Sequence, residues 1–165
     1  GTSGGVYKSV NQGAYWQQVN HGLVPEGMVK TSRALSVTSV QVDPFTTETV
    51  YAATLAGLYK TTDGAASWVR IGESLQDQMI VSMVLDRARP GVMYVAARDG
   101  IHRSDDGGKS WVALNEGLAT TNIRSLAQSA LDPQMFYAGT NGSGLYRSTD
   151  GGAHWEALPS VFPKE

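Results

Sequence analysis

The chain of 165 residues contains no cysteine, which excludes disulfide bonds, cysteine-ligated zinc and thiol catalysis. Charged residues make up only 17% of it and the formal net charge is −2, so it has no basic field for nucleic acid or an acidic membrane. No apolar run approaches the about 20 residues that a membrane span needs. No glycine-rich loop follows a strand and opens a helix, so no nucleotide or other cofactor is predicted. These absences predict no nucleic-acid or membrane partner, and they fit an extracytoplasmic location without requiring one.

What the sequence does contain is a repeat marked by tryptophan. All four tryptophans end the same eight-residue frame, and they are separated by 52, 43 and 44 residues. The recurring frame positions, to which we assign a structural role, are Ser9, Asn11, Gly13 and Trp16; Thr61, Asp63 and Trp68; Ser104, Asp106, Gly108 and Trp111; and Ser148, Asp150, Gly152 and Trp155. A period in the low forties predicts a repeat architecture.

Each period contains four short strand signals separated by turn residues. In one period they cover about 34–42, 50–55, 58–61 and 68–71. The turns between them carry Asp-Pro, Ala-Gly and Asp-Gly, in which glycine supplies a positive φ and aspartate bonds nearby amides. Four antiparallel strands in roughly 40 residues are typical of one blade of a β-propeller. The sequence therefore predicts an all-β fold built from such blades.

The frame suits the turn between the third and fourth strands of a blade. Its Ser or Thr, and the Asp two residues later, can bond backbone N–H groups in the turn. The glycine permits a left-handed backbone, and the tryptophan can fill the wedge between adjacent sheets. Asn11 keeps an acceptor where the other copies have Asp. Ala65 replaces the glycine of the second copy, so we expect that turn to be distorted.

The frame resembles the Asp-box, or bacterial neuraminidase repeat, S-x-D-x-G-x-x-W. The copies at 104–111 and 148–155 match it in full, and the resemblance covers essentially the whole chain. Sialidases, secreted xyloglucan-cleaving glycosidases, sortilin-type receptors and photosystem assembly factors carry this repeat. The resemblance implies a propeller in which the box stabilises a turn, contributes its tryptophan to the core and lies away from the active centre. It does not choose among these functions.

The repeat gives an arc of about 3.5 four-stranded blades in a single domain over 1–165. A half blade covers 1–20, and full blades cover about 34–75, 79–115 and 122–158. Propellers usually close with four to eight blades, so such an arc leaves two apolar faces and unpaired strand edges open. Three hypotheses stay open: a part of a longer propeller, a homo-oligomer, and an arc that is stable alone. The chain starts in mid-repeat with no signal-like segment, as a mature or truncated product would.

The first spacing is the longest and indicates an insertion of roughly nine residues between Trp16 and Ala34, in the stretch that contains 21–33. Gly22, Pro25 and Gly27 predict a loop there. A loop held by a rigid scaffold can carry function, and it can also vary neutrally. Both interpretations stay open.

Carboxylates are candidate catalytic groups because glycoside hydrolysis needs two of them about 5–10 Å apart. The aspartates that recur in every repeat suggest structure, since a catalytic residue should occur once. The non-recurring candidates are Glu26, Asp77, Asp99 and Glu116. Asp99 is the catalytic candidate to test first, with an ordinary turn role before Gly100 as the alternative. The arginine triad and Arg-Ile-Pro-like phrase of sialidases are not recognisable.

No metal site is predicted. Asp105–Gly108 is the best calcium candidate, but the distal glutamate of an EF-hand loop is missing. His21, His102 and His154 show no metal-ligand spacing. One basic position recurs in every repeat, and we expect its aliphatic stems to lie over neighbouring aromatics, with a ring for acidic ligands as the alternative. Its members are Lys8, Lys60, Arg103 and Arg147.

The leading functional hypothesis is a non-catalytic binding or scaffolding module whose ligand is a protein or a glycan. The alternative is a fragment of a secreted glycoside hydrolase resembling the xyloglucan-cleaving enzymes, in which two propellers hold the substrate cleft between them. A third hypothesis is similarity to photosystem assembly factors, which are larger closed rings.

Overall fold

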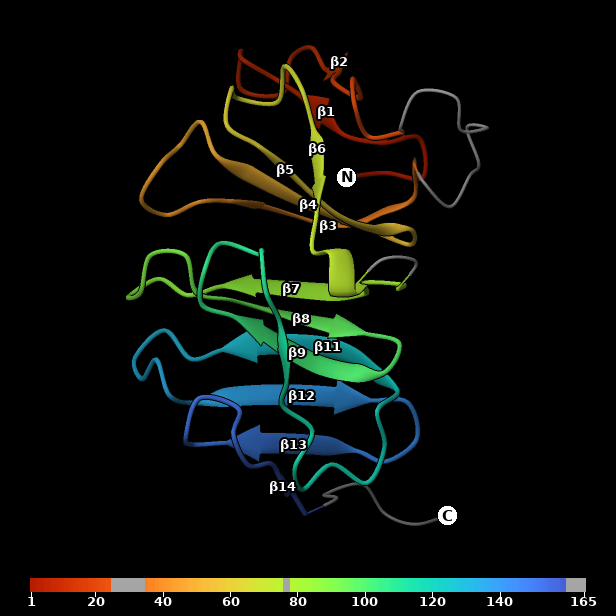
Figure 1. Cartoon of the computed structure of the whole chain (residues 1–165). Helices are drawn as coiled ribbons and strands as arrows, with labels where there is room; N and C mark the ends of the chain where they lie inside the picture. Colours follow the sequence, from red (N-terminus) through yellow and green to blue (C-terminus); the bar gives the residue numbers. More distant parts are fainter. Residues whose placement is uncertain (25–34, 76–77, 160–165) are drawn as a thin grey trace.

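The computed structural model describes residues 1–24, 35–75 and 78–159 (Figure 1). Two of the predicted candidates, Glu26 and Asp77, and most of the insertion at 21–33 lie outside the described residues. The described residues form fourteen strands in four antiparallel sheets, with one short 3-10 helix, η1 (Glu73–Leu75).

Each sheet is a meander whose strands lie side by side in the order of the chain. The half-sheet contains β1 (Tyr7–Lys8) and β2 (Gln17–Gln18). The first complete sheet contains β3 (Val37–Val42), β4 (Val50–Thr54), β5 (Gly57–Thr61) and β6 (Val69–Ile71). The second contains β7 (Ser82–Leu85), β8 (Met93–Ala97), β9 (Gly100–Ser104) and β10 (Val112–Ala113). The third contains β11 (Ile123–Gln128), β12 (Phe136–Thr140), β13 (Leu145–Ser148) and β14 (Glu156–Ala157).

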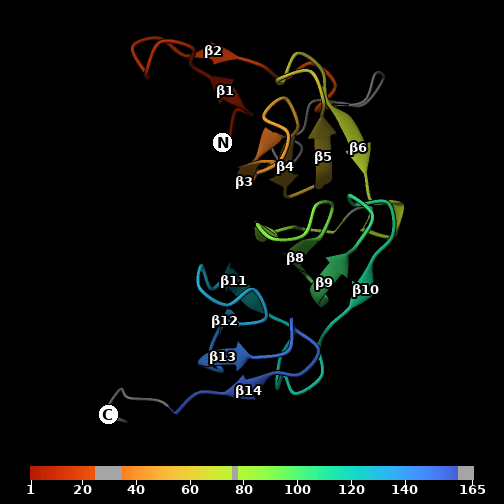
Figure 2. The same cartoon turned by 90° about the vertical axis from the view of Figure 1, so that its left-hand side faces the viewer.

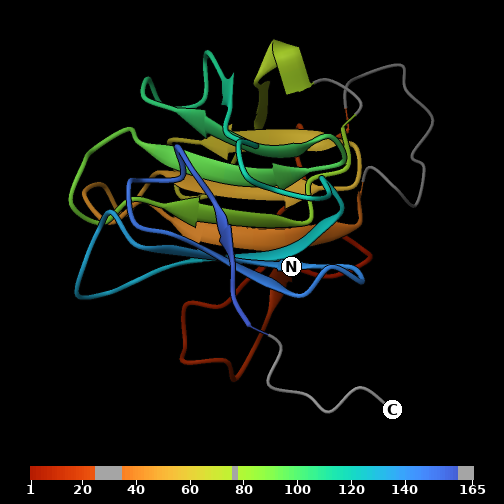
Figure 3. The ribbon, with the colours of Figure 1, turned by 90° about the horizontal axis from the view of Figure 1, so that it is seen from below.

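The four sheets stack in chain order, from β1 and β2 at the top of Figure 1 to β14 at the bottom. Adjacent sheets approach each other at their first strands, where β3 contacts β7 and β7 contacts β11. The outer strands β6 and β10 lie on the opposite side of the stack (Figure 2). Seen from below, the sheets overlie one another (Figure 3). This is the arrangement of successive propeller blades, and it confirms the predicted all-β arc.

Three separate cores fill the spaces between successive sheets, and β8 contributes side chains to two of them. In β8, Met93 and Val95 join the core shared with the preceding sheet, whereas Tyr94 and Ala96 join the core shared with the following one. The alternation of the β-strand therefore assigns one row of side chains to each neighbour. This rule explains why β8 is a continuous apolar segment with every residue buried.

Candidate functional site

Each frame folds into the same turn, which its first and third side chains hold. In the third copy the Ser104 hydroxyl accepts the Gly108 N–H at 2.8 Å and donates to the Asp106 carboxylate at 2.8 Å. That carboxylate also accepts the Ser110 backbone N–H at 2.9 Å and the Ser110 hydroxyl at 2.6 Å. The other three copies repeat the bonds to the turn backbone and between the two side chains. The frame side chains thus replace backbone partners within the turn.

These donors keep the frame carboxyl groups ionised. The Ser67 hydroxyl is the main reason that the pKa of Asp63 lies well below its ordinary value, and Ser110 does the same to the pKa of Asp106. At Asp150 the backbone N–H of His154 is the main cause, and the pKa falls to about 2. A carboxyl group with a lowered pKa is a poor proton donor near neutral pH, so this turn chemistry does not suit acid catalysis.

The prediction that Ala65 distorts its turn is wrong. Ala65 adopts φ +75°, close to the +91° of Gly108 at the same frame position. Its N–H still reaches the Thr61 hydroxyl at 3.1 Å, and the residue is 5% exposed within the core between the half-sheet and the next sheet. The hydrogen bonds and the buried methyl group offset the about 1–2 kcal/mol that a left-handed backbone costs a residue with a Cβ.

The four tryptophans differ in burial according to what precedes them. Trp68 and Trp155 are each 3% exposed, and their indole N–H groups donate to the preceding sheet's Val19 and Leu114 carbonyls at 2.8 and 3.0 Å. Trp111 is partly buried and donates instead to Gly108 in its own turn at 3.1 Å. Trp16 has no described sheet before it and is 57% exposed.

A recurring Asn-x-Gly-Leu segment, missed in the sequence analysis, wraps the outer strand of two sheets. The Asn115 side chain accepts the Ile101 N–H at 2.8 Å, and the Glu116 carbonyl then accepts the Trp155 N–H at 2.8 Å. Gly117 has φ +86°, and a Cβ there would lie 2.0 Å from the Trp155 carbonyl oxygen, so only glycine fits. Residues 20–23 make the same contacts around Trp68. The phrases N-H-G-L and N-E-G-L were the available signal.

Asp99, the catalytic candidate, lies in the turn between β8 and β9. Its carboxylate is 2.8 Å from His102 Nε2, and its backbone carbonyl accepts the Asn115 amide at 3.2 Å. The Asp99 side chain is 53% exposed, whereas that of His102 is 11% exposed. A carboxylate in this position can orient a histidine as a general base. His102, however, offers a substrate little accessible surface.

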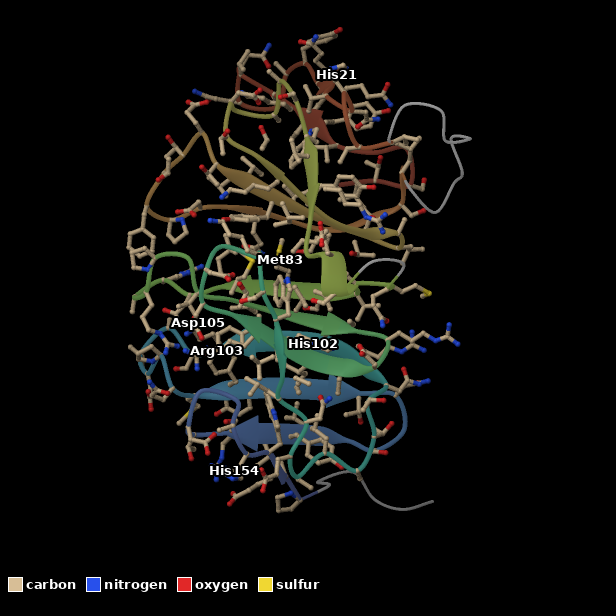
Figure 4. The ribbon with its side chains drawn as sticks, in the orientation of Figure 1. His21, Met83, His102, Arg103, Asp105 and His154 are labelled. Atoms are coloured by element: carbon tan, nitrogen blue, oxygen red, sulfur yellow. The ribbon has the colours of Figure 1, made fainter. Side chains whose placement is uncertain are left out.

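The other described candidate, Glu116, has a different histidine partner. Its carboxylate lies 3.5 Å from His154 Nε2, and the opposite ring nitrogen lies 2.6 Å from the Asp150 carboxylate. Figure 4 shows His21, His102 and His154 well separated along the stack. The structure therefore gives Asp99 and Glu116 separate partners rather than a shared one.

The calcium candidate Asp105–Gly108 is occupied by protein groups. Asp105 accepts two bonds from the Arg103 guanidinium, at 2.6 and 3.0 Å, and both residues are labelled in Figure 4. Asp106 is engaged by its own frame turn. Within residues 1–24, 35–75 and 78–159 no cluster of three or more His, Cys, Asp or Glu residues could hold a metal ion. No helix in those ranges is long and apolar enough to cross a membrane.

The recurring basic residues make different contacts in different sheets. Lys60 Nζ lies 5.3 Å from the centre of the Tyr51 ring, and the Arg103 guanidinium lies 5.8 Å from the Tyr94 ring, so cation–π contacts form at two of the four positions. Lys8 donates to the Gly64 carbonyl of the next frame at 2.8 Å. The expected packing over neighbouring aromatics is therefore met at Lys60 and Arg103, whereas Lys8 binds a carbonyl and Arg147 lies 3.7 Å from the Glu156 carboxylate.

The buried carboxylate of Asp86 joins the second and third complete sheets. Asp86 is 1% exposed and accepts two bonds from Arg89, at 2.6 and 3.0 Å, and one from Gln128 of the next sheet at 3.0 Å. Burial alone would raise the pKa of Asp86, but these bonds together lower it. The recurrence of Asp86 indicated a structural role, whereas nothing in the sequence indicated Arg89 as its partner.

The sequence matches no family model, and no curated protein matches it significantly. Solved structures do match. An ancestral enzyme of glycoside hydrolase family 74 (GH74) has a TM-score of 0.78 and 24% identity, over 98% of this chain and 22% of that one. The GH74 xyloglucanase of Xanthomonas campestris has a TM-score of 0.75 and 18% identity, over 98% and 28%. YCF48 bound to a D1 peptide has a TM-score of 0.58 and 19% identity, over 74% and 39%.

These neighbours are β-propellers, and the likeness shows that this chain has their fold. Every identity is below 25%, so the likeness extends to fold alone. The chain spans about a quarter of the length of the two GH74 enzymes.

Proposed function

We propose that this chain is a non-catalytic β-propeller module that binds a protein or a glycan. The observation that carries the proposal is a groove of about 320 Å³ beside the turn that contains Asp99. Met79 and Val81 give it an apolar side, and Arg98, Asn122 and Arg124 give it exposed polar groups. A concave surface with a few convergent polar groups is the usual form of a ligand site.

The lowered pKa values of four carboxyl groups support binding over catalysis. Hydrogen bonds lower the pKa of four described carboxyl groups, those of Asp63, Asp86, Asp106 and Asp150. A glycosidase acid needs a raised pKa in order to stay protonated. The solved neighbours support both ligand classes, since one is a xyloglucanase and another is bound to a peptide.

We also propose a repeat family for the chain, the bounds of its blades and a partner for its open faces. The frame turns support membership of the Asp-box repeat proteins, with the frame residues serving the fold. The blade boundaries we propose remain 34–75, 79–115 and 122–158, after a half blade over 1–20. The open faces of the arc support a partner there, either further blades of a longer propeller or other copies of the chain.

The alternative is a fragment of a secreted glycoside hydrolase, and the Asp99–His102 contact of 2.8 Å is the observation that favours it. A glycan array combined with a reducing-sugar assay on xyloglucan separates the two. Binding without release of reducing ends is expected for the module. Release that disappears in Asp99→Asn would instead establish the enzyme.

The groove has its own matched pair of variants. Arg124→Ala should remove ligand binding, because Arg124 lines the groove. Arg87→Ala should not, because Arg87 lies in the turn between β7 and β8 and lines a different groove. Equal binding by the two variants would place the ligand elsewhere.

A further inference from the structure

The turn between β12 and β13 is longer than the equivalent turns of the other complete sheets (Figure 1). In the first two complete sheets, two residues separate the second strand from the glycine that begins the third strand. In the third sheet, three residues, at 141–143, separate Thr140 from the equivalent Gly144. All of 141–144 is exposed. The longer turn thus presents an asparagine followed by a glycine, Asn141 and Gly142, at the surface.

This exposure is a property of the turn and not of the place of its sheet in the stack. Arg98 and Asp99 form the equivalent turn of the second complete sheet, which packs against a neighbouring sheet on each face. Both residues are nevertheless exposed. A turn between the second and third strands lies at the edge of its sheet, where chemical change is tolerated best.

The turn holds Asn141 by its backbone and leaves its side chain free. The Asn141 N–H donates to the Asn122 carbonyl at 2.9 Å, which connects the turn to the residue before β11. Within residues 1–24, 35–75 and 78–159, no hydrogen bond involves the Asn141 side-chain amide. The carbonyl carbon of this amide is therefore accessible to a nucleophile.

The nearest such nucleophile along the chain is the backbone nitrogen of Gly142. Its N–H has no hydrogen-bond partner among the residues that the structure describes. Gly142 has φ +95°, and an added Cβ would have no atom within 4 Å, so the space around it is open. Glycine has no side chain to obstruct the nitrogen, and its backbone can turn toward the asparagine. Both reacting groups are thus free in the folded chain.

The other four asparagines of the chain lack this combination, since none of them precedes a glycine. The side chains of Asn11, Asn20 and Asn115 accept backbone N–H groups at 2.8 to 2.9 Å. Asn122 is exposed, but the next residue, Ile123, is β-branched, and its N–H already donates to a backbone carbonyl at 2.8 Å. Asn141 is therefore singled out by its neighbour as well as by its exposure.

We propose that Asn141 is a site of spontaneous deamidation, for which water is the only co-reactant. The Gly142 nitrogen bonds to the side-chain carbonyl carbon of Asn141, and the side-chain nitrogen leaves as ammonia with the proton of the Gly142 N–H. Water then opens the cyclic imide that results. Opening at the side-chain carbonyl gives aspartate, and opening at the backbone carbonyl gives isoaspartate, in which the chain continues through the side-chain carbon.

The conversion changes both charge and backbone in this turn. It adds one negative charge to a chain whose formal net charge is −2. The isoaspartate form also lengthens the backbone between Thr140 and Gly144, whose hydrogen bond of 3.0 Å closes the turn. These changes occur beside Asn122, which lines the loop-side groove of the proposed function. Deamidation itself does not require that this groove bind a ligand.

Incubation of the full chain in heavy-oxygen water at mildly alkaline pH tests the site. The tryptic peptide over 125–147 should take up heavy oxygen as a hydroxyl replaces the amide, and fragmentation should place the change at Asn141 rather than at Gln128 or Gln134. The tryptic peptide over 110–124 contains Asn115 and Asn122 and is the internal control. It should stay unchanged in the same sample.

A synthetic peptide that copies residues 137–145, Y-A-G-T-N-G-S-G-L, gives the rate without the fold. The folded chain should convert within several-fold of this rate, because the turn leaves both reacting groups free. Conversion should accelerate as the pH rises, since the attacking nitrogen must lose its proton.

Two glycine variants form a matched pair. Gly142 and Gly144 both have a positive φ, +95° and +79°, and an added Cβ at either would have no atom within 4 Å. Gly142→Ala should slow conversion several-fold, because its methyl group crowds the attacking nitrogen. Gly144→Ala strains the same turn but leaves the reacting pair intact, so it should convert at the parent rate.

Three results would overturn the proposal: an unchanged peptide over 125–147, equal conversion rates in the two glycine variants, or conversion that appears only after the chain is unfolded in urea. The last would mean that the folded turn protects Asn141. None of them alters the ligand binding expected of Arg124→Ala, so the two proposals can fail independently.

Discussion

At the scale of single residues, the frame turn depends on two successive left-handed residues. The second of these is Gly13, Ala65, Gly108 or Gly152, with φ between +75° and +91°. Ala65 shows that a methyl group can be accommodated where the neighbouring sheet leaves room. The same substitution should therefore have different costs in different copies.

Gly108→Ala should destabilise the fold more than Gly13→Ala. A Cβ at Gly108 would lie 2.6 Å from the Ile71 side chain, whereas one at Gly13 would have its nearest neighbour, Trp16, at 3.8 Å. Both changes carry the about 1–2 kcal/mol cost of the left-handed backbone, and overpacking adds about 1–3 kcal/mol at Gly108. Urea unfolding of the two variants measures the difference, and equal costs would mean that Ile71 moves freely.

Asp150→Asn should make the fold less sensitive to acid. The folded-state pKa of Asp150, about 2, lies below its ordinary value of 3.8, so its stabilising effect is present above about pH 4 and is lost as the pH falls through about 2. The variant should thus have a lower urea midpoint than the parent at pH 7, and the gap should close near pH 2. Asn11 shows that an amide keeps the turn geometry. A gap that stays constant with pH would show that the effect is not electrostatic.

At the scale of elements, the outer strands are short, and hydrogen bonds from neighbouring segments hold the residues where these strands begin. The Asn-x-Gly-Leu segments at 20–23 and 115–118 bind the start of the next outer strand, whereas the corresponding residues after β6 form η1. Trp111 lacks this wrap and is correspondingly less buried than Trp68 and Trp155.

Asn115→Ala should destabilise the chain by about 1–3 kcal/mol, because it leaves the N–H of the buried Ile101 without its acceptor. Asn141→Ala is the control, since Asn141 is exposed in the turn after β12, and it should change stability by less than about 0.5 kcal/mol. Thermal unfolding of both variants provides the measurement. If Asn115→Ala behaves like the control, water replaces the amide.

The repeat made the strands predictable, because a period of 43 residues aligns turn signals across copies. The first strand was expected over 34–42 and begins at Val37, since alternation alone does not mark an edge. Side-chain contacts were harder to predict from the sequence. The bond from Gln128 to Asp86 depends on how two neighbouring sheets meet. The contacts of Asp86 with Arg89 and of Asp99 with His102 are local, and they depend on the geometry of a single turn.

At the scale of the whole molecule, the described arc has two unlike ends. The first exposes Tyr15 and Trp16, at 69% and 57%, and the last exposes Leu145 at 44%. Tyr137 is only partly buried, although its counterparts Tyr51 and Tyr94 are 2% and 0% exposed. Within the repeat, the first end corresponds to a sheet face that packs on a preceding sheet, and the last end to a face that packs on a following sheet. The two ends are therefore complementary to each other.

The chain should therefore associate end to end as its concentration rises. Trp16→Lys and Leu145→Lys should each weaken association, because each puts a charge on one apolar end. Val69→Lys is the control, since Val69 is 66% exposed on an outer strand. Light scattering after size exclusion, over a concentration series, gives the mass. A folded monomer that persists at high micromolar concentration would contradict the expectation.

Each core is shared by only two neighbouring sheets, so each sheet is coupled directly only to the sheets beside it. A disturbance in the half-sheet reaches β14 only through all three interfaces between successive sheets, so stability accumulates one interface at a time. Fraying should start at the ends, with the two-residue strands β1 and β2 exchanging their amides before β8, which is buried on both faces. The second complete sheet, which contains β8, should thus be the last part of the arc to open.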